Sequence, residues 1–179
     1  MRHGAQARDR VRATTRRGAG MSDGAVVAGW MRTVCRGRDG RVKWVDEGWN
    51  LITDEGLDWI LTGDVTSGLH VGIADNAGNA QGTWGMGDLS EVTAYTEAAR
   101  PSYQSSVASQ TATNDGNEAA FSVDTDGTSY DGAFIATDDT KGGTGGTLIA
   151  VRQRGGGSRT LDDGDTLEIQ YDLSLSRPS

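Results

Sequence analysis

Alternation of apolar and polar residues is clearest near the end of the chain, over residues 166–176. Apolar side chains occupy every second position of this stretch, at Leu167, Ile169, Tyr171, Leu173 and Leu175. In an extended strand, this period of two places every apolar side chain on one face and every polar side chain on the other. A strand with one polar face is typical of an antiparallel sheet whose apolar face is covered by a second layer. The pattern therefore predicts a strand from Thr166 to Ser176 within a layered β fold.

Short apolar segments recur through the rest of the chain, separated by turns rich in Gly, Asp and Asn. Val26–Cys35 and Arg41–Val45 predict a β-hairpin whose tip is Arg36–Gly40. Further strands are predicted at Leu69–Ile73, Ser105–Thr111, Ala119–Val123, Gly132–Thr137 and Gly146–Arg152. Strands at regular intervals with turn signals between them are typical of an antiparallel sandwich or barrel. We therefore expect a mainly all-β fold, an antiparallel β-sandwich of which a jelly roll is one form.

One short α-helix is predicted near residues 54–62. Thr53 is a suitable N-cap, and the two acidic residues that follow it oppose the positive end of the helix dipole. The helix has an apolar stripe at Leu57, Ile60 and Leu61. A helix this short does not persist alone in water, so we expect it to pack on the sheet.

Composition divides the chain of 179 residues into three parts. These are a basic leader at 1–20, an N-terminal β-hairpin or arm at 21–48, and a β-sandwich domain at 49–179. Three hypotheses account for the leader: a disordered basic arm that grips nucleic acid or an acidic neighbour, an Arg-rich targeting peptide, or upstream sequence translated from a misassigned start. The abrupt change of composition at Met21 favours the last, with Met21 as the true first residue.

Charge is distributed unevenly along the chain. The net charge is −8, but residues 1–20 carry six Arg against one Asp, which leaves 11 Lys and Arg against 24 Asp and Glu in the remainder. A body this acidic is poorly suited to nucleic acid, because phosphate contacts require clustered cations. No run of 18 apolar residues is present, so no membrane span is predicted. The single cysteine, Cys35, is expected to be a buried small apolar residue.

Few residues suggest a reaction or a metal. His70 is the only histidine outside the leader, and a lone histidine on a strand is more often structural than catalytic. Asp124, Asp126 and Asp131 are the calcium candidates, but this segment lacks the further ligands of an EF-hand, and Asp is also a common turn residue. We therefore expect no catalytic residues, no cofactor and no metal, and keep these three aspartates as the calcium candidates.

A glycan-degrading or carbohydrate-binding role stays open as an alternative. Paired carboxylates for glycoside hydrolysis need a defined separation in space, which sequence spacing does not give. Among the acidic residues, Glu97 is expected to form an ion pair with Arg100, three residues away, rather than to act as a catalytic acid. A carbohydrate-binding sandwich needs exposed aromatic residues, and burial mostly explains the five tryptophans, Trp30, Trp44, Trp49, Trp59 and Trp84.

A succession of short motifs now resembles one known group of proteins. The motifs are Asn50–Leu61, Leu69–Ile73, Thr93–Pro101, Ala119–Val123, Gly132–Ile135, Gly143–Ala150 and Arg159–Tyr171. Their order resembles small virion structural proteins of tailed bacteriophages, over about residues 49–176. The leader and the 26–45 hairpin lie outside this resemblance, and the hairpin is hypothesised to be an arm that reaches a neighbouring subunit.

The resemblance implies a non-enzymatic β-sandwich on the phage particle, made in the host cytoplasm. It implies a capsid decoration (cement) protein on the outer surface of the major capsid protein shell, with a tail or baseplate component as the alternative. The expected partners are the major capsid protein and copies of the chain itself, in a homotrimer or another homo-oligomer. Contacts are expected from the Arg36–Gly40 tip and the Ala74–Ser90 loop, through Arg36, Arg38, Trp84 and Met86. Arg36 and Arg38 are also explained by a solvated loop, and Trp84 and Met86 by packing back onto the fold.

Overall fold

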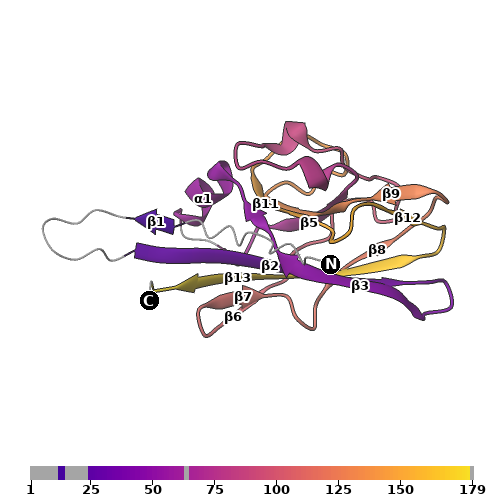
Figure 1. The fold of residues 1–179 in the computed structure, drawn as a ribbon, viewed down its shortest axis with the longest axis horizontal. Coiled ribbons are helices and arrows are strands. Elements are labelled where there is room, and N and C mark those ends of the chain that lie inside the picture. Colours follow the sequence, from indigo (N-terminus) through magenta and orange to yellow (C-terminus); the bar gives the residue numbers. More distant parts are fainter. Residues whose placement is uncertain (1–11, 15–23, 63–64, 178–179) are drawn as a thin grey trace, which may run out of the picture.

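The computed structural model describes residues 12–14, 24–62 and 65–177. Two antiparallel sheets pack against each other and enclose the main core (Figure 1). The larger sheet comprises β1 (Arg12–Thr14), β2 (Gly24–Arg36), β3 (Val42–Trp49), β6 (Ser106–Ala108), β7 (Thr111–Thr113), β8 (Ala119–Ser122) and β13 (Thr166–Ser176). The smaller sheet comprises β4 (Leu51–Ile52), β5 (His70–Ala74), β10 (Gly132–Ala136) and β11 (Leu148–Gln153), and a separate pair is formed by β9 (Thr128–Tyr130) and β12 (Arg159–Leu161). The expected mainly all-β, sandwich-like fold is confirmed.

The long strands β2 and β13 form the centre of the larger sheet. They pair antiparallel from Thr166 opposite Arg36 to Ser176 opposite Val26. The predicted apolar face of β13 is buried in the main core, at Leu167, Ile169, Tyr171 and Leu173. The alternation of the sequence therefore identified both the strand and the side that faces the core.

The predicted hairpin is present but is not a separate arm. β2 and β3 pair over residues 30–36 and 42–49. β2 also pairs with β13 along its length and contributes Met31 and Cys35 to the main core. The domain boundary expected after residue 48 therefore falls inside the body of the fold, because the hairpin supplies a central strand of the larger sheet.

The second edge of β13 is shared by two short strands. β8 pairs with the first part of β13 and β7 with a later part, and β6 extends the sheet beyond β7. Between them, the buried side chain of Asn114 takes the place of a strand. Its Oδ1 accepts a hydrogen bond from the Tyr171 amide at 2.7 Å, and its Nδ2 donates to the Ile169 carbonyl at 3.1 Å. The backbone of β13 thus stays hydrogen-bonded across the gap.

The predicted helix is α1 (Asp54–Ile60), and its start is the one expected. The Thr53 side chain accepts a hydrogen bond from the Gly56 amide at 3.0 Å, as an N-cap does. The helix lies against β11 so closely that a Cβ at residue 56 would collide with the carbonyl oxygen of Ile149. Glycine is therefore required inside this short helix by the close approach of the sheet.

The long loop after β5 covers the outer face of the smaller sheet. It contains the 3₁₀ turns η1 (Ala77–Asn79) and η2 (Met86–Asp88), which lie above β5 and β11 in Figure 1. A second apolar cluster joins Ala77 and Met86 of the loop to Phe134, Leu148 and Val151 of the sheet. The smaller sheet is therefore buried on both faces, which explains the continuous burial of β10 and the near-continuous burial of β11.

One expectation about the chain trace is corrected. The stretch predicted as one strand, Ser105–Thr111, belongs to the β6–β7 hairpin, whose turn residues Ser109 and Gln110 both have positive φ, at 51° and 68°. Gly or Asn usually marks a left-handed turn in a sequence. This turn has neither residue, so the pattern did not predict it. The leader expected at 1–20 lies outside the described residues except for β1, which pairs with the start of β2.

Candidate functional site

An edge strand with exposed apolar side chains forms the first candidate surface. β3 pairs with β2, and none of the described strands pairs with its other edge. Its side chains Val42, Val45 and Trp49 are 50%, 46% and 62% exposed. An unpaired strand edge beside exposed apolar side chains is suited to binding another chain.

Apolar side chains of β2 lie beside those of β3, with the Arg32–Glu47 ion pair between them and Val34 itself 6% exposed. Trp30 lies opposite Trp49, and Val34 lies opposite Val45, so these side chains share the outer face of the larger sheet. Val42 lies at the end of the same strand, opposite Arg36. We call this surface the β3 face and define it by five residues, Trp30, Val34, Val42, Val45 and Trp49.

Arg36 and Arg38, which were expected to contact a partner, both form ion pairs within the chain. Arg36 Nε lies 3.1 Å from Glu168 Oε1 of β13. Arg38 Nη2 lies 2.6 Å from Asp163 Oδ2, in the turn that precedes β13. Both pairs are solvent-exposed enough to contribute little to stability. The role of Arg36 and Arg38 as contact residues stays a prediction.

The base of the hairpin tip is tied to the same turn. Lys43 Nζ donates hydrogen bonds to Asp165 at 2.7 Å and to Asp162 at 2.9 Å, and these bonds, Asp165 first, raise the pKa of Lys43. Cys35 is fully buried, as predicted. Burial, and to a lesser degree the nearby Asp165 carboxylate, raises the pKa of the Cys35 thiol to about 11. This thiol therefore stays protonated and weakly nucleophilic at neutral pH.

A groove of about 590 Å³ opens beside β3 and forms the second candidate site. From β3 and the η1 turn, its lining includes Glu47, Gly48, Trp49, Ala77 and Gly78. From β11 and the turn that follows, its lining includes Arg152, Gln153, Arg154 and the glycines at 155–157. We call this site the β3–β11 groove. Trp49 belongs to both surfaces, and its exposure corrects the expectation that burial explains this tryptophan.

The two arginines of the groove are both buried but are paired differently. Arg152 Nη1 forms an ion pair with Asp46, whose other oxygen accepts the Gly155 amide at 3.0 Å. Around the Arg154 guanidinium, no carboxylate oxygen of the described chain lies within 4.0 Å. Arg154 Nη1 donates to the Gly157 carbonyl at 2.6 Å, and the guanidinium lies 5.3 Å from the centre of the Trp44 ring. The Nε atoms of both arginines are buried without a partner.

The two predicted contact residues of the 74–90 loop lie against the fold. Met86 is 4% exposed and belongs to the second apolar cluster. Trp84 is partly buried and packs against the same cluster. Their packing is explained by the need to cover the smaller sheet. A contact with a partner stays a prediction for Trp84 and Met86, and only Trp84 keeps appreciable exposed surface.

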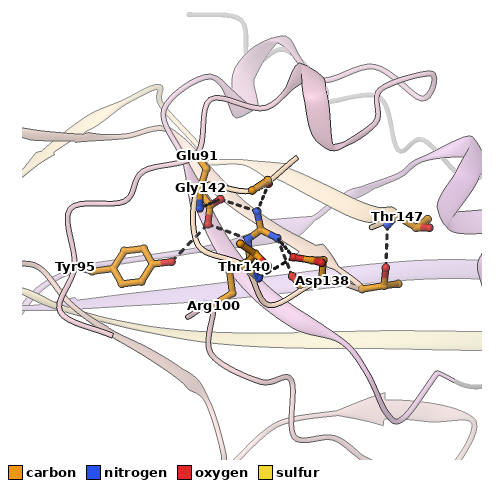
Figure 2. Close-up of polar contacts among 9 residues, drawn as sticks. Glu91, Tyr95, Arg100, Asp138, Thr140, Gly142 and Thr147 are labelled. Atoms are coloured by element: carbon orange, nitrogen blue, oxygen red, sulfur yellow. Dashed lines mark hydrogen bonds and ion pairs between the residues drawn. The ribbon is translucent and has the colours of Figure 1, made fainter. Parts of the chain in front are cut away.

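A polar cluster apart from these two candidate surfaces surrounds Arg100, whose side chain is fully buried. Its Nε and Nη2 donate to the two oxygens of Glu91 at 3.0 and 2.7 Å, and its Nη1 donates to the Asp138 carbonyl at 2.7 Å. Figure 2 shows the guanidinium held between Glu91 and Asp138. The guanidinium also lies 5.4 Å from the centre of the Phe134 ring. We call this cluster the Arg100 clamp.

The clamp corrects the expected pairing of Arg100 with Glu97. Residues 97–100 are not helical, so a spacing of three does not bring their side chains together. Glu97 instead accepts a hydrogen bond from the Ser122 amide at 3.1 Å. Hydrogen bonds from Thr140 lower the pKa of Asp138 at the edge of the clamp. The clamp joins the segment after β5 to the loop between β10 and β11, so its role is structural.

The calcium candidates do not gather around one point. Asp124 accepts a hydrogen bond from Thr125, and Asp126 accepts one from the Asp163 amide, both in exposed turns. Asp131 is buried and accepts the Gly78 amide at 2.6 Å. Within the described ranges, no group of three His, Cys, Asp or Glu side chains, His70 included, is arranged to hold a metal ion.

Comparisons with known proteins give no relative. No family model matches the chain, and neither a curated protein nor a solved structure matches it. In residues 12–14, 24–62 and 65–177, no helix is long and apolar enough to cross a membrane.

Sequence reasoning missed the β3–β11 groove. Its signal in the sequence is an Arg-x-Arg pair, Arg152 and Arg154, at the end of a buried apolar strand and directly before three glycines. Arginines are rarely buried without a partner, so charges inside an apolar strand deserve a structural explanation. The sequence does not reveal which carboxylates lie nearby, because Asp46 is more than a hundred residues away along the chain.

Proposed function

We propose that this protein is a non-enzymatic structural protein that docks on a larger protein assembly through the β3 face. The supporting observation is the half-exposed apolar row at Val42, Val45 and Trp49 on an edge strand. Removing apolar surface from water is worth about 25 cal/mol for each Å², so docking of this row stabilises a complex. The edge of β3 that no described strand pairs with offers backbone hydrogen bonds to the same partner.

We propose that the assembly is the particle of a tailed bacteriophage. This step rests on the resemblance of the motif order over residues 49–176 to small virion structural proteins. The proposed role is a capsid decoration (cement) protein on the outer surface of the major capsid protein shell. A tail or baseplate component is the alternative location, and either location accommodates copies of the chain around a symmetry axis.

The charges near the β3 face suit docking that is specific but reversible before assembly. The Arg32–Glu47 pair, with Nε and Oε2 3.6 Å apart, lies between the Trp30–Trp49 and Val34–Val45 pairs, and the Arg36–Glu168 pair lies at the end of the face beside Val42. Exposed charges of this kind set orientation and encounter rate more than affinity. The acidic body, in turn, keeps free subunits apart in solution.

Glycan hydrolysis is less well supported than docking. A glycosidase needs two carboxylates on either side of the bond that it cleaves. Among the described residues that line the β3–β11 groove, Glu47 is the one with a carboxylate. This composition suits a surface that binds without cleaving.

Purified phage particles test the proposal directly. We expect mass spectrometry to find the chain in particles of the phage that encodes it, and cryo-electron microscopy to place it on the shell with the β3 face covered. A Val42→Lys/Val45→Lys variant should lose binding to shells that lack the protein, because charge replaces the apolar contact. Val107→Lys is the matched control, since Val107 is 60% exposed on β6, outside the β3 face.

Three outcomes would contradict the proposal. The first is absence of the chain from purified particles. The second is a map in which the β3 face is solvent-exposed while another surface contacts the shell. The third is equal loss of binding in the β3-face variant and in Val107→Lys, since a general effect of added charge would then explain both. Density for the chain on the tail would instead select the alternative location.

A further inference from the structure

The β3–β11 groove contains a buried cation without a carboxylate partner. Arg154 is 7% exposed, and within the described part of the chain no carboxylate oxygen lies within 4.0 Å of its guanidinium. Removing a charge from water costs free energy unless an opposite charge or several hydrogen bonds replace the lost hydration. The groove therefore holds positive charge that the described protein leaves only partly compensated.

The compensation that is present comes from two neutral groups. The Gly157 carbonyl accepts one hydrogen bond, and the face of the Trp44 ring attracts the cation. Arg154 Nε has no partner although it is buried. A guanidinium has five N–H donors, and the described structure uses one of them, at Nη1. Because Nε is buried, an anion in the groove would pair with the Nη atoms.

The other charges of the groove limit which anion fits. The Gly155 amide already donates to Asp46, and the Gly78 amide already donates to Asp131. A phosphate site uses free backbone amides and clustered cations, and here two of the lining amides, those of Gly78 and Gly155, are occupied by carboxylates. Asp46 and Asp131 would also repel a doubly charged ion. A single negative charge, such as one carboxylate, suits Arg154 better.

The remaining lining suits the rest of a sugar molecule. Trp49 is 62% exposed at the rim, and the flat face of an indole packs against the C–H face of a pyranose ring. The exposed side chains of Glu47 and Gln153 can exchange hydrogen bonds with hydroxyl groups. A groove of about 590 Å³ has the size of an ordinary small-molecule site.

We propose that the β3–β11 groove binds a saccharide that carries a carboxylate, of the uronic acid class. The carboxylate pairs with Arg154, the ring lies on Trp49, and the hydroxyls face Glu47 and Gln153. Binding occurs without cleavage, since Glu47 has no second carboxylate in the described lining. The groove shares Trp49 with the β3 face, but Val42 and Val45 do not line it, so the docking variant leaves the groove lining unchanged.

Titration of the purified full chain with defined sugars tests this assignment. The probes are sodium D-glucuronate and trigalacturonate, with D-glucose and maltotriose as neutral controls and N-acetyl-triglycine as a peptide carboxylate. We expect saturable binding of the uronides with Kd values on the order of millimolar, and about tenfold weaker binding of the neutral sugars. In ¹H–¹⁵N spectra, the amide shifts should move at Gly155, Gly156 and Gly157.

Two variants and a matched control test whether Arg154 and Trp49 bind the uronide. Arg154→Met should weaken uronide binding about tenfold, because a charge-assisted hydrogen bond is lost. Trp49→Ala removes an exposed side chain, so this variant folds and should weaken binding of uronides about fivefold through the lost ring contact. Arg159→Met is the control, since Arg159 is an exposed arginine of β12 outside the lining. Its binding should equal that of the unmodified chain.

Several results would overturn the assignment. They are no binding of either uronide at about 10 mM, equal binding of D-glucose and D-glucuronate, binding of N-acetyl-triglycine without binding of uronides, and equal weakening by Arg159→Met. None of these results bears on the docking proposal, which the Val42→Lys/Val45→Lys variant tests separately. Conversely, loss of docking in that variant with intact uronide binding leaves the groove assignment standing.

Discussion

Two arginines of this fold, Arg100 and Arg154, are both buried but differ in how the protein satisfies their guanidinium groups. Arg100 donates hydrogen bonds to both carboxylate oxygens of Glu91 and to the carbonyls of Asp138 and Gly143. Arg154 donates to one carbonyl, that of Gly157, and has no carboxylate within 4.0 Å in the described structure. Each guanidinium also lies near an aromatic ring, so the rings do not distinguish them.

The difference separates a charge that holds the fold from a charge that faces a groove. The Arg100 clamp links two long loops, and its fully buried guanidinium uses four of its five N–H donors on protein atoms, which leaves little capacity for a ligand. Arg154 lies at the end of β11, where the chain turns through three glycines and the β3–β11 groove begins. A buried cation with unused donors beside an opening is characteristic of a binding site.

The largest expected effect comes from breaking the Arg100 clamp. Arg100→Met leaves Glu91 buried without a cation and two loop carbonyls without donors. We expect the free energy of unfolding to fall by about 3–5 kcal/mol, as for other buried pairs that lose one partner. Urea denaturation followed by tryptophan fluorescence measures this loss.

A double variant tests whether the penalty is due to the unpaired charge. In Arg100→Met/Glu91→Leu both charges are replaced by apolar groups, so this variant should be more stable than Arg100→Met alone. An equal or larger loss in the double variant would show that the backbone hydrogen bonds of Arg100, not its ion pair, hold the loops together.

Alkaline pH tests the burial of a third group in the core, the thiol of Cys35. The pKa of Cys35 is raised from 9.0 to about 11. Between these values the unfolded thiol loses its proton before the folded one, so the stability present below pH 9 declines as the pH rises towards 11. At pH 10 the expected loss from this thiol is about 1 kcal/mol. Lys43 and the buried tyrosines Tyr95, Tyr103, Tyr130 and Tyr171 also have raised pKa values and add to the decline in the same direction.

Unfolding measured at pH 8, 9 and 10 checks this slope. Cys35→Ala should show a shallower decline than the unmodified chain, whereas Arg100→Met and Arg154→Met should keep its slope. A stability that stays constant from pH 8 to 10 would mean that the thiol is not shielded from water. The same shielding predicts slow reaction of Cys35 with thiol reagents at pH 8 in the folded state and rapid reaction in urea.

Local patterns in the sequence were sufficient for most of the longer strands but not for the short strands or the charge clusters. The alternation at Leu167, Ile169, Tyr171 and Leu173 is a property of the chain itself, and a strand with that pattern has only one face to bury. The N-cap at Thr53 is equally local. The turn at Ser109 and Gln110 escaped prediction because left-handed backbone at residues other than Gly or Asn has no sequence signature.

Partners of buried charges depend on the tertiary fold. Spacing suggested Glu97 for Arg100, but the fold places Glu91 there and turns Glu97 towards Ser122. The lack of a carboxylate near Arg154 is a relation between distant segments, so no local pattern contains it. Burial was expected to explain Trp49, because the sequence does not show whether a further layer of the described structure covers the outer face of β3.

A smaller effect is expected from removing the charge of Arg154. Arg154→Met keeps most of the volume of the side chain and abolishes a buried charge that lacks a carboxylate. We expect the free energy of unfolding to change by less than about 1 kcal/mol, with a gain in stability as the favoured direction. The same urea denaturation series measures it. A loss as large as that of Arg100→Met would remove the distinction between the two arginines and assign Arg154 a structural role.

The smallest effect on stability is expected at Trp49, where the two candidate surfaces meet. Trp49→Ser removes a side chain that is 62% exposed, so the free energy of unfolding should change by about 0.5 kcal/mol or less. Trp44 is the matched comparison, because it is partly buried, packs against the main core and stacks on Tyr130 at 5.7 Å. Trp44→Ser should therefore cost at least about 2 kcal/mol. If Trp49→Ser were as destabilising as Trp44→Ser, Trp49 would be a packing residue of the monomer, and neither docking nor sugar binding would explain its exposure.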